Sequence, residues 1–361
     1  MKISRIEVGE VNIPLVTPFK TALRTVDSVN DLVVRITADD GRLGFGEAPP
    51  TAVITGETKG SICCAIEQFI APSIVGMEIE NLDGIMERLQ GCMLKNTSAK
   101  AAVDMAVYDL YAQSCQKPLY QVLGGRRAEI ETDLTISVNS VEEMVADSQK
   151  AVNEGFRILK IKVGKEGLAD VARIEAIRRA VGPAVRLRVD ANQGWGAKEA
   201  VRIIRAMEDR ALDIELVEQP VKADDFAGMQ YVTAHTATPI LADESVFSAR
   251  DAIRLMEGRA ADLINIKLMK AGGIYPALKI CAAAESFGVE CMIGCMLESK
   301  IAVSAAAHLA AAKGIITRAD LDGPSLCRLD PYEGGPAYDG PWIRMNRTPG
   351  LGIVSAPCFT S

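Results

Sequence analysis

Residues 158–164 read ILKIKVG, and this short β-rich run is followed by a stretch with helical spacing. The same alternation recurs from residue 132 to residue 323. Short strands that alternate with helices predict right-handed βαβ units and a parallel sheet. Eight such units predict a closed (β/α)8 barrel. The eight runs are TDLTISV (132–138), ILKIKVG (158–164), RLRVDAN (186–192), IELVEQP (214–220), PILADES (239–245), ADLINIKL (261–268), ECMIG (290–294) and TRADLDG (317–323).

The segments on either side of the predicted barrel have different patterns. Residues 3–13 and 31–39 alternate like half-buried strands, and helical spacing follows them. After Pro324 the chain is rich in Gly and Pro, as in DPYEGGPAYDGP (330–341). We therefore predict an α/β fold of three parts. These are an α+β capping domain (1–125), a (β/α) barrel catalytic domain (126–324) and a C-terminal return to the capping domain (325–361).

The composition excludes several classes of function. The chain has 361 residues, of which 48% are hydrophobic and 24% charged, and its formal net charge is −7. An acidic chain without a basic stripe predicts no nucleic-acid partner and no anionic membrane partner. Nine cysteines with irregular spacing and no CxxC pair predict reduced thiols in a cytoplasmic protein. The two histidines disfavour a histidine-rich metal site.

Ionisable residues recur in runs that should be apolar if they formed only buried strands. Lys162, Asp190, Glu218, Asp243 and Lys267 follow one another at intervals of 24 to 28 residues, which is one βα unit for each interval. The C-terminal ends of barrel strands are where active sites are built. Burial of an ionisable group on each strand is costly unless the groups serve each other or a ligand. We therefore predict that these side chains converge on one site.

The three carboxylates predict a metal site. Asp190, Glu218 and Asp243 belong to the third, fourth and fifth predicted strands, which are adjacent in a barrel. An oxygen-only set without Cys or His suits Mg²⁺ better than Zn²⁺. Each carboxylate alone could be a helix N-cap or an ion-pair partner, but three at matched intervals favour metal ligands. Asn192 and Glu244 are expected to orient these ligands from behind them.

The two lysines predict proton transfer. Lys162 and Lys267 fall on the second and sixth strands, which lie opposite each other in an eight-stranded ring. Opposed amines suit a reaction in which one removes a proton from the carbon next to a carboxylate and the other returns it on the opposite face. Loss of that proton gives an enediolate, which a metal ion would stabilise. Such a base must be neutral, and we expect burial and the neighbouring Lys160 to lower its pKa to about 7–8. Lys267 could instead reach solvent or form a Schiff base. The lysines at positions 160 and 162 could instead lie on the solvent-exposed face of an edge strand.

The ordered set KIK (160–162), VDAN (189–192), VEQP (217–220), ADES (242–245) and NIK (265–267) resembles the enolase superfamily, muconate-lactonising subgroup. The resemblance covers nearly the whole chain. Members of that superfamily use a Lys or His base with Mg²⁺ to stabilise an enediolate. The resemblance therefore implies an isomerase with Mg²⁺ as its cofactor.

Within that subgroup the chain resembles the dipeptide epimerases. This implies a dipeptide substrate, with L-Ala-D/L-Glu as the first choice, and a role in murein peptide recycling. Asp320 and Asp322 would bind the substrate's ammonium group, although Asp322-Gly323-Pro324 also has the pattern of a turn. Arg24, in PFKTALRT (18–25), would pair with the glutamate side chain. Other expected substrate contacts lie on strand ends or in the variable loops 17–27, 47–57 and 296–298. They are Thr135, Lys160, Cys295, Met296 and Glu298.

Two other interpretations stay open. An N-acylamino acid racemase, an o-succinylbenzoate synthase or a cycloisomerase would have the same fold and metal but a substrate without a free ammonium. A barrel that binds a metal and a ligand without catalysis would exchange no α-proton. The expected partner is a small molecule, and we expect a homo-oligomer.

Overall fold

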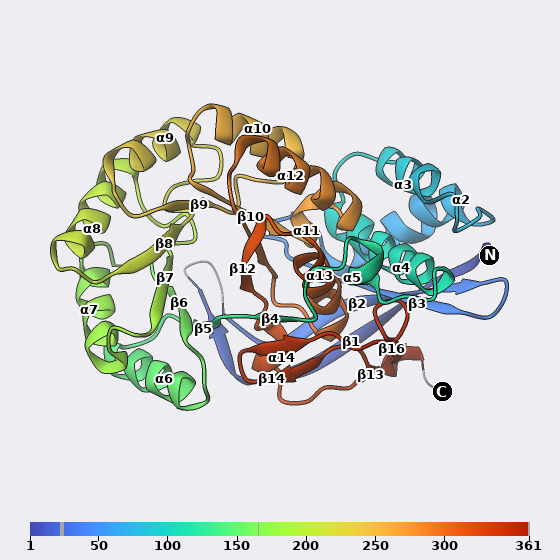
Figure 1. The fold of residues 1–361 in the computed structure, drawn as a ribbon, viewed down its shortest axis with the longest axis horizontal. Coiled ribbons are helices and arrows are strands. Elements are labelled where there is room, and N and C mark those ends of the chain that lie inside the picture. The colour runs from blue at the N-terminus through green and yellow to red at the C-terminus, as the bar shows by residue number, and fades with distance from the viewer. Residues whose placement is uncertain (22–24, 165, 360–361) are drawn as a thin grey trace.

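The computed structural model describes residues 1–21, 25–164 and 166–359. Eight parallel strands form one sheet, hydrogen-bonded in the order β12-β11-β10-β9-β8-β7-β6-β5, and helices pack around its outside (Figure 1). Each of the eight predicted runs contributes one of these strands, so the predicted (β/α)8-type barrel is confirmed. The strands are β5 (Leu134–Ile136), β6 (Ile158–Lys162), β7 (Arg186–Asp190), β8 (Ile214–Glu218), β9 (Ile240–Ala242), β10 (Leu263–Lys267), β11 (Cys291–Gly294) and β12 (Ile316–Asp320).

Some of the outer helices, α8 and α10 among them, are amphipathic and bury one face. In α8, residues 200, 201, 203, 204 and 207 are buried, which is the spacing of one helical face. A capping box between Ser140 and Glu143 begins α6. The helices are α6 (Val141–Asn153), α7 (Ala169–Val181), α8 (Ala197–Asp209), α9 (Phe226–His235), α10 (Ala249–Glu257), α11 (Leu268–Ala271), α12 (Ile274–Phe287), α13 (Lys300–Ala312) and α14 (Gly323–Leu326).

Side-chain hydrogen bonds join the first and last barrel strands, which are the two ends of the sheet order. The backbone N–H of Leu321 donates to Thr132 Oγ1 at 2.7 Å. The backbone N–H of Thr135 donates to Asp322 Oδ2 at 2.7 Å. The backbone N–H of Asp133 also donates to the carbonyl oxygen of Ala319 at 3.4 Å. Main-chain and side-chain hydrogen bonds therefore close the barrel next to the predicted ammonium-binding pair.

The N-terminal part is a three-stranded antiparallel sheet covered by helices. Its strands are β1 (Ile3–Lys20), β2 (Thr25–Ala38) and β3 (Leu43–Ala48). Helix α4 packs so closely on β3 that a Cβ atom at Gly46 would overlap the carbonyl oxygen of Ala102, which explains the glycine. The helices are α1 (Lys59–Cys64), the π-helical η1 (Ala65–Ile70), α2 (Ala71–Ile74), α3 (Leu82–Gly91), α4 (Thr97–Ser114) and α5 (Leu119–Val122).

Buried carboxylates of the N-terminal part hold the first turns of two barrel helices. Glu47 accepts hydrogen bonds from the backbone N–H groups of Ser299 at 2.8 Å and Ala302 at 2.9 Å, at the start of α13. Asp104 accepts one from the N–H of Ile274 at 2.6 Å, at the start of α12. A carboxylate at a helix N-terminus satisfies free N–H groups and opposes the helix dipole. These contacts fix the N-terminal part beside the C-terminal ends of the barrel strands.

The C-terminal segment contacts both other parts of the chain. Strands β14 (Ala337–Asp339) and β15 (Trp342–Arg344) extend an antiparallel sheet from β4 (Glu129–Glu131), which precedes the first barrel strand in the sequence. Phe359 lies under the guanidinium of Arg35, 4.3 Å from its ring centre, next to the N-terminal sheet. The division into residues 1–125, 126–324 and 325–361 stays a prediction. Among the described helices, none has the length and apolar character needed to cross a bilayer. The remaining elements are β4 (Glu129–Glu131), β13 (Glu333–Gly334), β14 (Ala337–Asp339), β15 (Trp342–Arg344), β16 (Ile353–Ser355) and the 3-10 turn η2 (Pro357–Phe359).

Candidate active site

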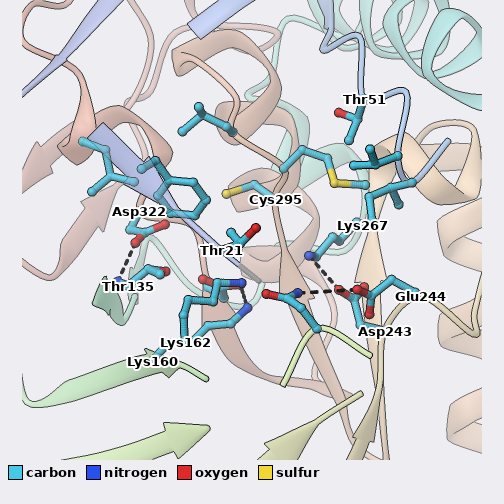
Figure 2. Close-up of a pocket in the computed structure, with 18 residues that line it drawn as sticks. Thr21, Thr51, Thr135, Lys160, Lys162, Asp243, Glu244, Lys267, Cys295 and Asp322 are labelled. Carbon is cyan, nitrogen blue, oxygen red and sulfur yellow. Dashed lines mark hydrogen bonds and ion pairs between the residues drawn. The ribbon is translucent and has the colours of Figure 1, made fainter. Parts of the chain in front are cut away.

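The polar side chains at the strand ends meet around one cavity (Figure 2). Asp190 and Glu218 lie buried beneath its lining, where both are ion-paired with Lys160. Arg24 lies outside the described residues. The predicted site residues that line the cavity are Thr135, Lys160, Lys162, Asn192, Asp243, Glu244, Lys267, Cys295, Met296, Asp320 and Asp322.

The three predicted metal ligands come from three adjacent strands, as expected. Asp190 and Glu218 are the last residues of β7 and β8 and are partners in the parallel register, and Asp243 directly follows β9. Lys160 Nζ lies 3.1 Å from Asp190 Oδ2 and 2.8 Å from Glu218 Oε2. It also lies 2.7 Å from Asp320 Oδ2. One buried amine therefore joins two of the predicted ligands to Asp320, the last residue of β12.

The crowding of carboxylates in this buried site shifts their proton affinities. Burial and the nearby Asp190 raise the pKa of Glu218 to about 8. Burial also opposes ionisation of Asp243, but the amines of Lys267 and Lys270 hold its pKa well below the usual range. A cation bound between these carboxylates would relieve the repulsion that raises the Glu218 pKa.

The donor set fits Mg²⁺. Every candidate ligand atom is a carboxylate or amide oxygen, the donor type that Mg²⁺ prefers. Asn192 Oδ1 and Glu244 Oε2 are buried without a hydrogen-bond partner among the described residues. In the part of the chain that the structure describes, no three acidic, histidine or cysteine side chains already surround one point as ligands would. Lysine amines lie against all three carboxylates instead.

The two candidate acid/base lysines enter the cavity from different sides (Figure 2). Lys162 ends β6 and Lys267 ends β10, and three strands separate β6 from β10 in the sheet order. Lys162 Nζ lies 2.6 Å from Asp190 Oδ2, and Lys267 Nζ lies 2.8 Å from Asp243 Oδ2. The predicted opposition of the strands is thus present, and each amine has its own carboxylate.

The expectation of a lowered lysine pKa is wrong for Lys267 in this structure. Burial alone would lower the pKa of the Lys267 amine, but the Asp243 carboxylate beside it raises that pKa above the usual range. The sequence predicts a cationic neighbour, Lys160, beside Lys162. The structure instead pairs each with an acid, because the carboxylates at the ends of the adjacent strands lie closer.

The acidic pair of the last strand faces the cavity at the seam of the barrel. Asp320 ends β12, whereas Asp322 lies beyond the strand and is the residue before α14. Asp322 therefore lies outside the strand, and both side chains line the cavity. Burial and the neighbouring Asp320 raise the pKa of Asp322 to about 6. Burial opposes ionisation of Asp320 too, but Lys160 holds its pKa at about 2.

The loop after β11 contributes two of its three predicted substrate contacts to the cavity. Cys295 and Met296 line it. Glu298 is buried outside the lining, where its Oε1 accepts a hydrogen bond from the backbone N–H of Met296 at 2.6 Å. A substrate contact by Glu298 stays a prediction.

Some lining residues were not singled out from the sequence. Most lie in the loops 17–27, 47–57 and 296–298, where variable positions were expected, but no residue in these loops has a pattern that marks it as a contact. Their apolar or hydroxyl side chains cover the cavity from the N-terminal part, from the loop after β11 and from α14. They are Phe19, Thr21, Thr51, Val53, Ile54, Leu297 and Leu326.

Comparison with protein families agrees with this geometry. Residues 3–124 match the mandelate racemase / muconate lactonizing enzyme N-terminal domain, and residues 143–357 match the enolase C-terminal domain-like family. The chain belongs to the mandelate racemase / muconate lactonizing enzyme family. The predicted enolase-superfamily membership is confirmed.

Individual relatives are similar over almost their whole length. The chain is 56% identical to the L-Ala-D/L-Glu epimerase of Clostridium acetobutylicum over 98% of this chain and 99% of the relative. A substrate-liganded complex of the L-Ala-D/L-Glu epimerase from Bacillus subtilis matches with a TM-score of 0.97 and 55% identity, over 98% and 99% of the two chains. The dipeptide epimerase of Enterococcus faecalis, complexed with Mg and L-Leu-L-Tyr, matches with a TM-score of 0.95 and 44% identity, over 98% and 100%. The prediction of an isomerase is confirmed.

Proposed function

We propose that this protein is a dipeptide epimerase that inverts the α-carbon of the C-terminal residue, with L-Ala-D/L-Glu as its substrate. The observation that carries the proposal is that Lys162 and Lys267 reach one cavity from opposed strands, beside the acidic pair Asp320 and Asp322. An epimerase needs a proton carrier on each face of the stereocentre, and a free dipeptide needs a partner for its ammonium group. The epimerases among its relatives support the same conclusion.

Asp190, Glu218 and Asp243 are the residues that would hold Mg²⁺. A bound ion would neutralise the negative charge that develops on the substrate's carboxylate oxygens as the α-proton leaves. Asn192 would keep Asp190 in place, because its backbone N–H donates to Asp190 Oδ1 at 2.9 Å. Its side chain in turn contacts Glu244, with Nδ2 3.4 Å from Oε1.

The chain's lysines perform the proton transfer. One of Lys162 and Lys267 removes the α-proton from its face of the substrate, and the other, in its ammonium form, delivers a proton to the opposite face. Both side chains are more than nine-tenths buried, so the site limits proton exchange with bulk water. Lys160 supplies positive charge for the substrate's carboxylate.

Recognition of the substrate follows from charge. Asp320 and Asp322 would bind the ammonium of the N-terminal residue, and Arg24 would pair with the glutamate carboxylate. This acidic pair disfavours N-acylated substrates, because they bring no ammonium to the buried Asp322 carboxylate, whereas Asp320 already faces Lys160 at 2.7 Å. We further propose a cytoplasmic homo-oligomer that acts in murein peptide recycling. All nine cysteines are free thiols, which suits a reducing compartment.

The test is a dipeptide screen in D2O, followed by NMR. We expect L-Ala-L-Glu and L-Ala-D-Glu to interconvert and to gain deuterium at the glutamate α-carbon with Mg²⁺ present. EDTA should stop the reaction and added Mg²⁺ should restore it. N-succinyl amino acids serve as the comparison set. Faster turnover of that set than of every dipeptide would contradict the proposal.

A further inference from the structure

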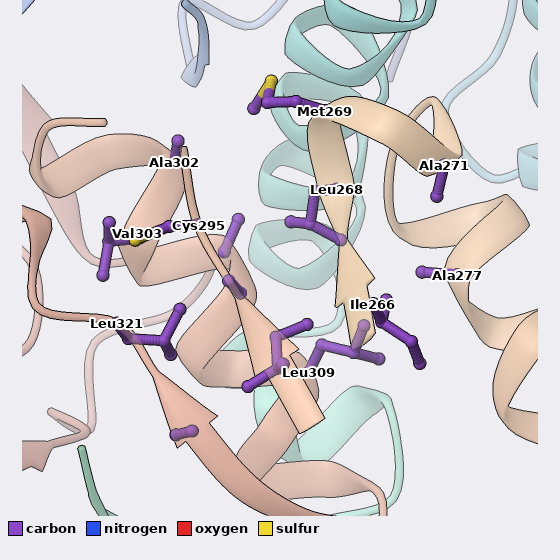
Figure 3. Close-up of a cluster of buried hydrophobic side chains, with 14 of the residues drawn as sticks. Ile266, Leu268, Met269, Ala271, Ala277, Cys295, Ala302, Val303, Leu309 and Leu321 are labelled. Atoms are coloured by element: carbon purple, nitrogen blue, oxygen red, sulfur yellow. The ribbon is translucent and has the colours of Figure 1, made fainter. Parts of the chain in front are cut away.

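A fourth lysine lies behind the cavity, in the short helix α11 that directly follows Lys267. The residues around it in α11 are buried and apolar, and Figure 3 shows Leu268, Met269 and Ala271 among them. Lys270 itself has no exposed surface, and it does not line the cavity. A lysine is almost never buried in this way unless its amine has specific partners. Its partners therefore indicate what it does.

The Lys270 amine is bound to one of the predicted metal ligands by two contacts. Nζ lies 2.6 Å from Asp243 Oδ1 and also donates a short hydrogen bond to the main-chain oxygen of Asp243. The other carboxylate oxygen, Oδ2, is the one that faces Lys267 at 2.8 Å. Lys270 thus fixes both the backbone and the rotation of the Asp243 carboxylate.

The same amine reaches a second predicted ligand through one intermediate residue. Nζ donates to the main-chain oxygen of Asn265 at 3.2 Å. The side chain of Asn265 donates from Nδ2 to Glu218 Oε1 at 3.0 Å. A single buried amine therefore connects the supports of Asp243 and Glu218, which end or follow adjacent strands.

We propose that Lys270 is a positioning residue that holds the Asp243 and Glu218 carboxylates in the arrangement that receives Mg²⁺. This inference rests on the metal site of the proposed function. Hydrogen bonds from behind a ligand fix its orientation, and their loss typically costs about 10- to 100-fold in metal affinity. Lys270 touches neither the cavity nor the reacting atoms.

The charge of Lys270 alone would have the opposite effect on Mg²⁺ affinity. The direction in which the affinity changes on replacement of Lys270 therefore tests the proposal. A cation next to a metal ligand repels Mg²⁺ and competes for the carboxylate's charge. If Lys270 acted only through its charge, its replacement by a neutral residue would tighten Mg²⁺ binding. If it acts by positioning, the replacement weakens binding.

The experiment is isothermal titration of the full-length, metal-free protein with Mg²⁺ and no substrate. Lys270→Met keeps most of the apolar stem and removes the amine, and we expect the Mg²⁺ Kd to rise about 10- to 100-fold. Lys270→Gln retains a neutral NH2 donor group, and its Kd should rise by less. If Lys270→Met does not fold, the Mg²⁺ Kd of Lys270→Gln is used instead, and a rise in that Kd supports positioning.

Lys100→Met is the matched control. Lys100 is also buried, and its amine donates to two main-chain oxygens, those of Gln90 at 2.9 Å and Met93 at 2.6 Å, away from the site. This variant should keep the wild-type Kd. An unchanged or lower Kd in the Lys270 variants overturns the inference, as does an equal rise in Lys100→Met. Failure of the wild-type protein to bind Mg²⁺ overturns the proposed metal site itself.

Discussion

Replacement of Asp322 by asparagine tests how the site recognises an ammonium group. Asp322 Oδ2 accepts the backbone N–H of Thr135 at 2.7 Å, and the asparagine side-chain oxygen can keep that bond. The substitution therefore removes the charge and leaves the seam between β5 and β12 joined. The side chain is only 4% exposed, so water and salt screen its charge little.

The size of the effect follows from the buried ionic hydrogen bond that is lost. Such a bond contributes about 1.5–3 kcal/mol, which corresponds to about 10- to 150-fold in kcat/KM. The assay compares L-Ala-L-Glu with its N-acetylated form, which has no ammonium. In Asp322→Asn the preference for the free dipeptide should fall by this factor, chiefly because its kcat/KM falls.

Asp225→Asn provides the matched control for this change. Asp225 caps α9 through the N–H of Gly228 at 2.8 Å and does not line the cavity. This variant should keep the wild-type preference for the free dipeptide. If Asp322→Asn also keeps that preference, Asp322 does not bind the ammonium.

Two further predictions concern the joint between the N-terminal part and the barrel. Burial lowers the pKa of His308 to about 4, so the folded state binds fewer protons than the unfolded state between pH 4 and 6.5. As the pH falls from 7 to 4, the free energy of unfolding of the wild type should therefore fall by about 3 kcal/mol more than that of His308→Asn. Urea unfolding that shows the same pH dependence for both proteins would refute this. Glu47→Gln turns an amide NH2 toward one of the two N–H groups that Glu47 accepts at the start of α13, and should lower the free energy of unfolding by about 2 kcal/mol. An unchanged urea midpoint would contradict this prediction.

The local pattern of the sequence predicted the barrel and much of its site. Strand-like runs are recognisable from neighbouring residues alone, so all eight strands were found. The ionisable residues in those runs mark strand ends: Lys162, Asp190, Glu218 and Lys267 are each the last residue of a strand. Parallel strands bring such ends together, so convergence on one cavity needed no further information.

Features that depend on contacts distant in sequence could not be predicted in the same way. The Lys267 amine lies 2.8 Å from the Asp243 carboxylate, which follows a neighbouring strand, and this contact raises the lysine pKa that was expected to be lowered. Asp322 lies in the loop beyond β12, where strand alternation no longer applies. Lys270 did have a signal, because an ionisable residue in the apolar segment LMKAGG demands a buried partner.

Separate replacement of the two cavity lysines tests most directly whether they work from opposite faces. Lys162→Met and Lys267→Met are each incubated in D2O with Mg²⁺ and with L-Ala-L-Glu or L-Ala-D-Glu, and α-deuterium is followed by NMR. Neither variant should epimerise the dipeptide. Each variant should exchange the α-proton of only one isomer, and the two variants should act on different isomers. Full epimerisation by either variant, or exchange of the same isomer by both, would contradict the two-lysine mechanism.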